Sequence, residues 1–155
     1  MAISIFNLNC WLFPPPISSD YKARLFAIIH LIKKRSPDII FLQEVWSNKS
    51  LEYLKNELKN YHSVSSKSLF YNNTGLVVFS KEKPISHKVK FFETTPRYNP
   101  IKQLLRKGYI EADIVLNGIK WKIVNTHLYA PTSEKTESIT KNQFLELISK
   151  IQGTN

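Results

Sequence analysis

Short apolar runs, each closed by Pro, Gly or polar residues, recur along the chain and predict β-strands. Runs of this length that are rich in Ile, Val and Phe are typical of strands buried in a sheet. The predicted strands cover 2–8, 38–43, 61–65, 68–71, 76–80, 85–92, 106–116 and 119–125.

Three longer segments have apolar residues at spacings of three and four, which predicts amphipathic helices at 21–35, 49–60 and 134–151. The first helix is expected to bury one face made of Tyr21, Leu25, Ile28, Ile29 and Ile32. The last is expected to bury Phe144, Leu147, Ile148 and Ile151. The segment 94–105 contains two prolines and is expected to be a surface loop.

The order of these elements indicates the fold class. A strand, a helix and a second strand at the N-terminus predict a βαβ unit with parallel strands. Asn117-Gly118 is a strong two-residue hairpin signal, so the strands on either side of it should be antiparallel. Together they predict an α/β or α+β domain with a mixed sheet.

Composition adds a constraint on partners. The chain has 155 residues, enough for one domain, and a formal net charge of +10. Such a charge suggests a nucleic acid, an anionic membrane surface or a phosphate-bearing substrate, although lysines that only solvate the surface explain it equally well. Cys10 is the only cysteine, which excludes an internal disulfide and a cysteine-based zinc site. No apolar stretch is long enough for a membrane span, and the N-terminus lacks the pattern of a signal peptide. We therefore expect a cytoplasmic location, with peripheral membrane binding as an alternative.

Polar residues end three of the apolar strands. They are Asn7 and Asn9 in the first, Gln43-Glu44 in the second, and Asn125-Thr126-His127 in the third. Ligands of open sheets bind beyond strand ends, so the three ends predict one converging polar site. Glu44 with the amides of Asn9 or Asn7 would suit a hard cation such as Mg²⁺, and Mn²⁺ is an alternative.

Each of these residues also has a plainer interpretation. Glu44 alone could be a salt-bridged or edge-exposed glutamate, and His127 could be a strand-end histidine bonded to backbone. Glu111 and Asp113 alternate with apolar residues, so a solvated strand face is a better interpretation for them than a metal site.

Five segments, in this order, resemble the endonuclease/exonuclease/phosphatase superfamily. They are Ile5-Phe6-Asn7-Leu8-Asn9-Cys10-Trp11, Leu42-Gln43-Glu44-Val45-Trp46, Gly75-Leu76-Val77-Val78-Phe79-Ser80-Lys81, Lys107-Gly108-Tyr109 and Asn125-Thr126-His127-Leu128. The first two are most similar to the neutral sphingomyelinase branch of that superfamily.

The resemblance implies a four-layer α/β sandwich and an Mg²⁺-dependent hydrolase of phosphoester or phosphodiester bonds. It implies catalytic roles for His127, at the scissile phosphate, and for Asn7. It also implies a metal-ligand role for Glu44, with Asn9 next to the metal. Lys107 and Tyr109 lie in a motif that we expect to bind the substrate.

The resemblance covers only the first half of the family pattern, which runs on for roughly as long again. Its Gly-Asp-x-Asn and Ser-Asp-His motifs do not occur in these 155 residues. We therefore expect the sequence to be the N-terminal portion (1–155) of one such domain. Such a portion is expected to be inactive alone and to expose apolar surface, and a second polypeptide is one way in which the site could be completed.

The sequence leaves three functions open. One is a sphingomyelinase-like enzyme that cleaves phospholipid headgroups. Trp11, Phe13 and Trp46 could line an apolar mouth of its site, although packing in the core is the more common role of aromatic residues. Another is a nuclease acting on DNA or RNA. The third is a non-catalytic remnant that binds an anionic surface.

Overall fold

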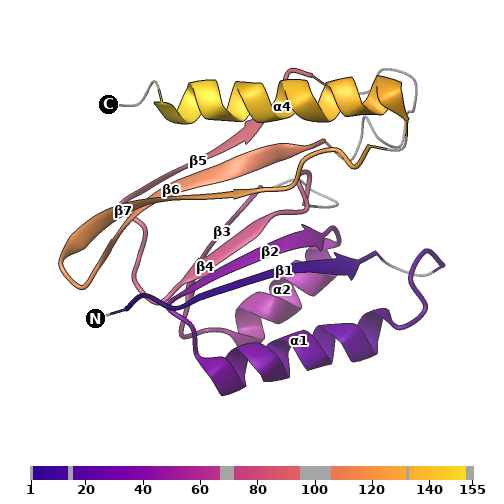
Figure 1. Ribbon diagram of the computed structural model, residues 1–155. Coiled ribbons are helices and arrows are strands. Elements are labelled where there is room, and N and C mark those ends of the chain that lie inside the picture. Colours follow the sequence, from indigo (N-terminus) through magenta and orange to yellow (C-terminus); the bar gives the residue numbers. More distant parts are fainter. Residues whose placement is uncertain (1, 14–15, 67–71, 95–105, 132, 153–155) are drawn as a thin grey trace.

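The computed structural model describes residues 2–13, 16–66, 72–94, 106–131 and 133–152. These residues form two β-sheets that face one another, with helices on the outer side of each sheet (Figure 1). The predicted mixed α/β architecture is confirmed, and its layers run helix, sheet, sheet, helix.

The first sheet contains the predicted βαβ unit. Its strand order is β1-β2-β4-β3. The strands β1 (Ile5–Leu12) and β2 (Ile39–Val45) are parallel, and α1 (Tyr21–Arg35) connects them. The strand β4 (Val77–Ser80) is antiparallel to β2 and to β3 (His62–Ser65).

The second sheet is antiparallel, with the order β5-β6-β7. Its strands are β5 (Ser86–Phe91), β6 (Gly108–Leu116) and β7 (Ile119–Thr126). Asn117 and Gly118 join β6 to β7 with φ angles of 54° and 76°. Two consecutive positive φ angles are typical of the type I′ turn, which confirms the predicted hairpin.

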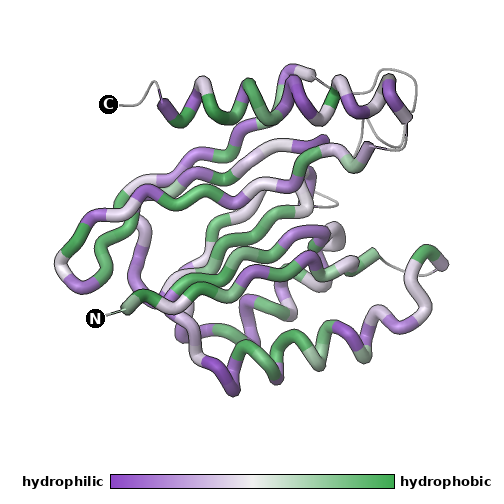
Figure 2. The backbone as a smooth tube through the Cα atoms, in the orientation of Figure 1, coloured by the Kyte–Doolittle hydropathy of each residue, from purple (hydrophilic) through white to green (hydrophobic). Residues whose placement is uncertain are grey.

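Three layers of apolar contact hold the sandwich together. The helices α1 and α2 (Asn48–Glu57) cover the outer face of the first sheet, and α4 (Glu134–Gln152) covers the second (Figure 1). Between the sheets, residues of β2 and β4 such as Ile39 and Val78 pack against Ile110 and Ile114 of β6. Figure 2 shows hydrophobic positions along the strands and also in the helices α1 and α4. None of the helices in the described ranges is long and apolar enough to cross a bilayer.

The two sheets are open along one side. Within the described residues, β1 pairs only with β2 and β7 pairs only with β6, so each sheet ends there in an unpaired strand. Large apolar side chains are exposed on these two strands: Ile5 is 58% exposed, Ile119 58% and Trp121 41%. An exposed edge of this kind is a template for pairing with another chain.

The predicted elements differ from the structure in a few places. The strand β1 begins three residues later than expected and continues to Leu12, through the polar residues that were expected to follow it. The predicted strand 68–71 and nearly all of the predicted loop 94–105 lie outside the described residues.

The buried face of α4 was predicted incorrectly at one residue. Phe144 is 51% exposed, and its neighbour Gln143 is fully buried in its place. The Gln143 side chain accepts a hydrogen bond from the Tyr129 N–H (2.8 Å) and donates one to the Thr94 carbonyl (2.8 Å). Satisfying these two backbone groups turns the helix so that Phe144 faces outward.

Candidate active site at the carboxyl ends of β1, β2 and β7

The backbone bends sharply where β1 and β2 end. Glu44 has a φ of 59° and Trp11 a φ of 46°, and the register of β1 against β2 shifts between Asn9 and Leu12. A left-handed conformation is uncommon for residues other than glycine. Strain of this kind clusters at functional sites, where the surrounding structure maintains it. Both bends lie at the same edge of the sheet because β1 and β2 are parallel.

Asn9 holds the carboxylate of Glu44. Its Nδ2 donates a hydrogen bond to Glu44 Oε1 at 3.1 Å, and its Oδ1 accepts one from the Trp11 N–H at 3.1 Å. The side chain therefore bridges the bend of β1 and the carboxylate on β2.

His127 and Lys107 approach this carboxylate from the second sheet. Lys107 Nζ lies 2.9 Å from His127 Nδ1, and His127 Nε2 lies 3.7 Å from Glu44 Oε1. The Lys107 ammonium also lies 5.4 Å from the centre of the Trp46 ring, within the range of a cation–π contact. The structure thus brings together four of the six predicted site residues: Asn9, Glu44, Lys107 and His127.

Burial changes the protonation of the two basic groups. Desolvation is the main cause that lowers the pKa of Lys107 to about 8, although the nearby Glu44 charge opposes this. Burial, and then the Lys107 charge, lower the pKa of His127 to about 4. At neutral pH His127 is therefore neutral, and its approach to Glu44 is not an ion pair. Since an ammonium has no acceptor, Lys107 donates to Nδ1 and the imidazole carries its proton on Nε2.

An amide network lies beside these groups, buried at Gln43 and Asn125 and exposed at Asn7. Gln43 Nε2 donates to Asn7 Oδ1 (2.8 Å) and to Asn125 Oδ1 (2.7 Å), which joins β1, β2 and β7. Asn125 Nδ2 donates in turn to the carbonyls of Leu42 and Val77. Asn7 therefore supports the network from β1. The structural roles of Gln43 and Asn125 were not predicted, although each is an uncharged polar residue in an apolar strand.

Tyr109 lies away from this cluster. It is 4% exposed and packs against Phe92, with ring centres 5.8 Å apart, and against Leu147 of α4. Burial is the main cause that raises the pKa of its hydroxyl. Strand alternation explains this placement, because Tyr109 points to the outer face of β6.

A hollow of about 430 Å³ opens between the sheets beside the cluster. Its lining residues come from both sheets: Ile5, Asn7, Phe41, Gln43, Val124, Asn125, Thr126 and His127.

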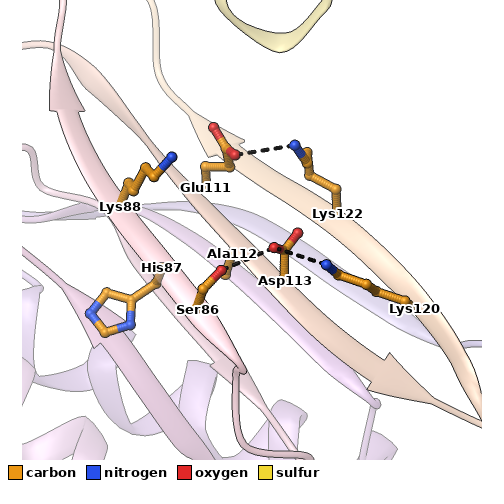
Figure 3. Close-up of a pocket in the computed structure, with 8 residues that line it drawn as sticks. All are labelled: Ser86, His87, Lys88, Glu111, Ala112, Asp113, Lys120 and Lys122. Atoms are coloured by element: carbon orange, nitrogen blue, oxygen red, sulfur yellow. Dashed lines mark hydrogen bonds and ion pairs between the residues drawn. The ribbon is translucent and has the colours of Figure 1, made fainter. Parts of the chain in front are cut away.

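A second hollow, of about 480 Å³, lies on the outer face of the second sheet (Figure 3). The two carboxylates that line this hollow each pair with a lysine. Glu111 lies 3.5 Å from Lys122, and Asp113 lies 3.5 Å from Lys120. Glu111 and Asp113 thus pair with lysines on a strand face, but their side chains are only 13% and 20% exposed, less than the predicted solvated face would give. The more spacious hollow is therefore not the one near the predicted chemistry.

The residues present fit a divalent cation only in part. Glu44 Oε1 is engaged by Asn9, while its Oε2 has no hydrogen bond to any described residue and is available to a cation. The Asn9 amide turns its nitrogen, not its oxygen, towards the carboxylate, which differs from the expected place beside a metal. Among the described residues, no group of three His, Cys, Asp or Glu side chains is arranged to hold a metal. Mg²⁺ often uses one or two carboxylates and completes its shell with water and substrate phosphate.

Comparison with known families identifies the fold. The profile of the Endonuclease/Exonuclease/phosphatase family matches residues 6–139. The chain belongs to this family. The resemblance seen in the sequence is therefore confirmed.

Two curated relatives are sphingomyelinases by name. Sphingomyelin phosphodiesterase 2 of Homo sapiens is 31% identical over 99 residues, which are 63% of this chain and 23% of that protein. A putative neutral sphingomyelinase of Drosophila melanogaster is 24% identical over 159 aligned positions, covering 98% of this chain and 35% of that protein. The chain thus spans about a quarter to a third of the length of these relatives.

Solved structures share the fold at low identity. Sphingomyelinase C from Streptomyces griseocarneus superposes with a TM-score of 0.83 at 16% identity, covering 99% of this chain and 59% of that chain. D. rerio TDP2, solved in complex with a single strand DNA product, superposes with a TM-score of 0.77 at 18% identity, covering 99% of this chain and 56% of that chain. At such identities the likeness establishes the fold alone.

Proposed function

We propose that this chain carries the first part of a metal-dependent phosphodiester hydrolase active site, of the sphingomyelinase-like kind that cleaves phospholipid headgroups. The observation that supports this proposal is the convergence of Glu44, Asn9, His127 and Lys107 at one sheet edge. Family members are generally metal-dependent, and this matches the free oxygen of Glu44. Mg²⁺ is our choice of cation, with Mn²⁺ as a substitute.

Each residue has a distinct part in the proposed site. Glu44 would hold the cation, which when bound stabilises negative charge on the phosphoryl group. Asn9 fixes the Glu44 carboxylate. His127, neutral and protonated on Nε2, donates a hydrogen bond to a phosphoryl oxygen, and Lys107 fixes that tautomer while adding a positive charge beside the phosphate.

We further propose that the site is completed by more polypeptide, either a continuation of this chain or a second chain. One carboxylate does not provide both a cation site and a base that activates water. The relatives extend well beyond the matched region, and the open edges of β1 and β7 offer a place for added strands.

Phospholipid is the preferred substrate class because the curated relatives are named sphingomyelinases. Cleavage of nucleic acid is the second candidate, supported by the net charge of +10 and by the likeness to a protein solved with DNA. We also propose a cytoplasmic location.

Turnover assays test the proposal. The purified chain, alone and joined to whatever the gene encodes after residue 155, is incubated with Mg²⁺ and either sphingomyelin vesicles or single-stranded DNA. We expect little turnover by the chain alone, and Mg²⁺-dependent sphingomyelin hydrolysis by the completed protein that Glu44→Gln reduces at least 100-fold. Preferential cleavage of DNA would replace the lipid assignment by the nuclease one. Absence of turnover by every form would leave a remnant that only binds.

A further inference from the structure

An exposed apolar lip lies next to the site, at the end of β1. Its two apolar residues are Trp11 and Ile17, and Arg24 completes it by contacting the Trp11 ring. Trp11 is 50% exposed and Ile17 is 62% exposed. In Figure 1 the described residues 16–20, which lead into α1, project away from the body of the two sheets.

The lip is a built structure, held by one arginine. Arg24 Nη1 donates to the Trp11 carbonyl (3.2 Å) and to Ser18 Oγ (2.8 Å), and its guanidinium lies 4.8 Å from the centre of the Trp11 ring. Ser18 is 1% exposed, so this end of the segment is fixed while its neighbour Ile17 points outward.

The lip is also joined to the site by hydrogen bonds. The Trp11 N–H donates to the side chain of Asn9, and Asn9 donates to the Glu44 carboxylate. The left-handed conformation of Trp11, with φ of 46°, is part of the same bend. A surface bound at Trp11 would therefore lie two residues from a residue that orients Glu44.

We propose that this lip docks the protein on the surface of an anionic phospholipid bilayer. The inference rests on the proposed function and deepens it by naming the surface from which the substrate is taken. Trp is favoured at the headgroup level of bilayers, and an aliphatic side chain beside it adds buried apolar area. Arg24 and the exposed Lys22 at the start of α1 supply two positive charges against the one negative charge of Asp20, within a chain of net charge +10.

The lip suits lipid better than nucleic acid. Single strands are bound by aromatic faces on which bases stack. One face of Trp11 is already covered by the Arg24 guanidinium, and Ile17 offers no stacking surface. Both features are compatible with insertion of a ring edge and an aliphatic chain into the interface.

Vesicle binding tests this proposal without any need for turnover. The 155-residue chain is titrated, in the absence of Mg²⁺, with vesicles of phosphatidylcholine alone and with vesicles that contain phosphatidylserine. We expect binding to the anionic vesicles and at least a tenfold loss of binding in the double variant Trp11→Ser, Ile17→Ser. In a variant that keeps only Trp11 of the three tryptophans (Trp46→Phe, Trp121→Phe), brominated lipid should quench the fluorescence.

The matched control is Phe144→Ser with Ile85→Ser, which removes equally exposed apolar residues from α4 and from the segment before β5. Circular dichroism checks that both double variants are folded. If the lip variant is not folded, the milder single variant Ile17→Ser is tested in its place. Equal loss in the control, no binding by the unmodified chain, or a selective loss of affinity for single-stranded DNA would overturn the proposal. Because vesicle binding is measured without Mg²⁺ and without turnover, its outcome does not depend on the turnover assay, so failure of either proposal is visible separately.

Discussion

At the scale of single residues, the site depends on placing ionisable groups where water cannot fully solvate them. Glu44, His127 and Lys107 come from segments far apart in sequence, and burial lowers the pKa of both His127 and Lys107. Cys10 shows the same effect without a role in chemistry. Burial, and then the Glu44 charge, raise its pKa to about 12, so the thiol is unreactive.

The buried imidazole predicts a pH dependence of stability. Folding lowers the pKa of His127 from 6.5 to about 4, so the unfolded chain binds a proton more readily between these values. The contribution of the neutral His127 side chain to the free energy of unfolding is therefore fully present above pH 6.5 and is lost as the pH falls through 4. When the pH is lowered from 7.5 to 4.5, the free energy of unfolding should fall for both proteins. The fall should be smaller for His127→Gln than for the unmodified protein, by about 1–2 kcal/mol. Urea denaturation at the two pH values measures this.

The control is His62→Gln, on an exposed residue of β3. Its pH dependence should match that of the unmodified protein. If His127→Gln and His62→Gln behave alike, the imidazole of His127 is not held neutral by the fold.

At the scale of elements, the hydrophobic pattern predicted most strands and helices because burial on one face is a local, periodic signal. The turn at Asn117-Gly118 was predictable because few other pairs adopt two positive φ angles. The bend at Glu44 was not, since a left-handed glutamate is imposed by its surroundings. The burial of Gln143 on α4 was missed for a similar reason, because its partners lie in distant segments.

Close pairing of β5 and β6 depends on Gly108. A Cβ atom at this position would lie 2.0 Å from the carbonyl oxygen of Lys90, on the facing strand. We expect Gly108→Ala to lower the free energy of unfolding by about 1–3 kcal/mol, because backbone must move to accept it. Gly118→Ala is the comparison. A Cβ there meets nothing within 4 Å, and only the φ of +76° opposes it. Urea denaturation of both variants gives the difference, and a smaller effect for Gly108→Ala would contradict this account of the pairing.

At the scale of the whole molecule, the two sheets form a sandwich whose core is laid open along β1 and β7. Asn9, Glu44 and His127 were predicted to meet because each lies at a polar strand end, whereas Lys107, which precedes β6, was predicted only from its family motif. The burial of Tyr109 beneath α4 was not predicted, because the Lys107-Gly108-Tyr109 motif does not show which face of the strand a helix covers.

The open side predicts self-association of the isolated chain. Ile119 and Trp121 are exposed on the unpaired strand β7, next to the core between the sheets. Sedimentation velocity should show association that increases with concentration, and Ile119→Lys should suppress it by placing charge on the edge. Val115→Lys is the control, because Val115 is 40% exposed on the opposite face of the hairpin. A chain that stays monomeric at high concentration would refute this prediction.

The most direct test of the central claim, that Glu44 organises one cation-binding site with Asn9 and His127, is a titration with paramagnetic Mn²⁺ followed by NMR. We predict that the amide signals of Asn9, Val45 and His127 broaden first, that those of Glu111 and Asp113 persist, and that Glu44→Gln removes the effect. Broadening centred on Glu111 and Asp113, or broadening at Asn9 that Glu44→Gln leaves unchanged, would contradict the account.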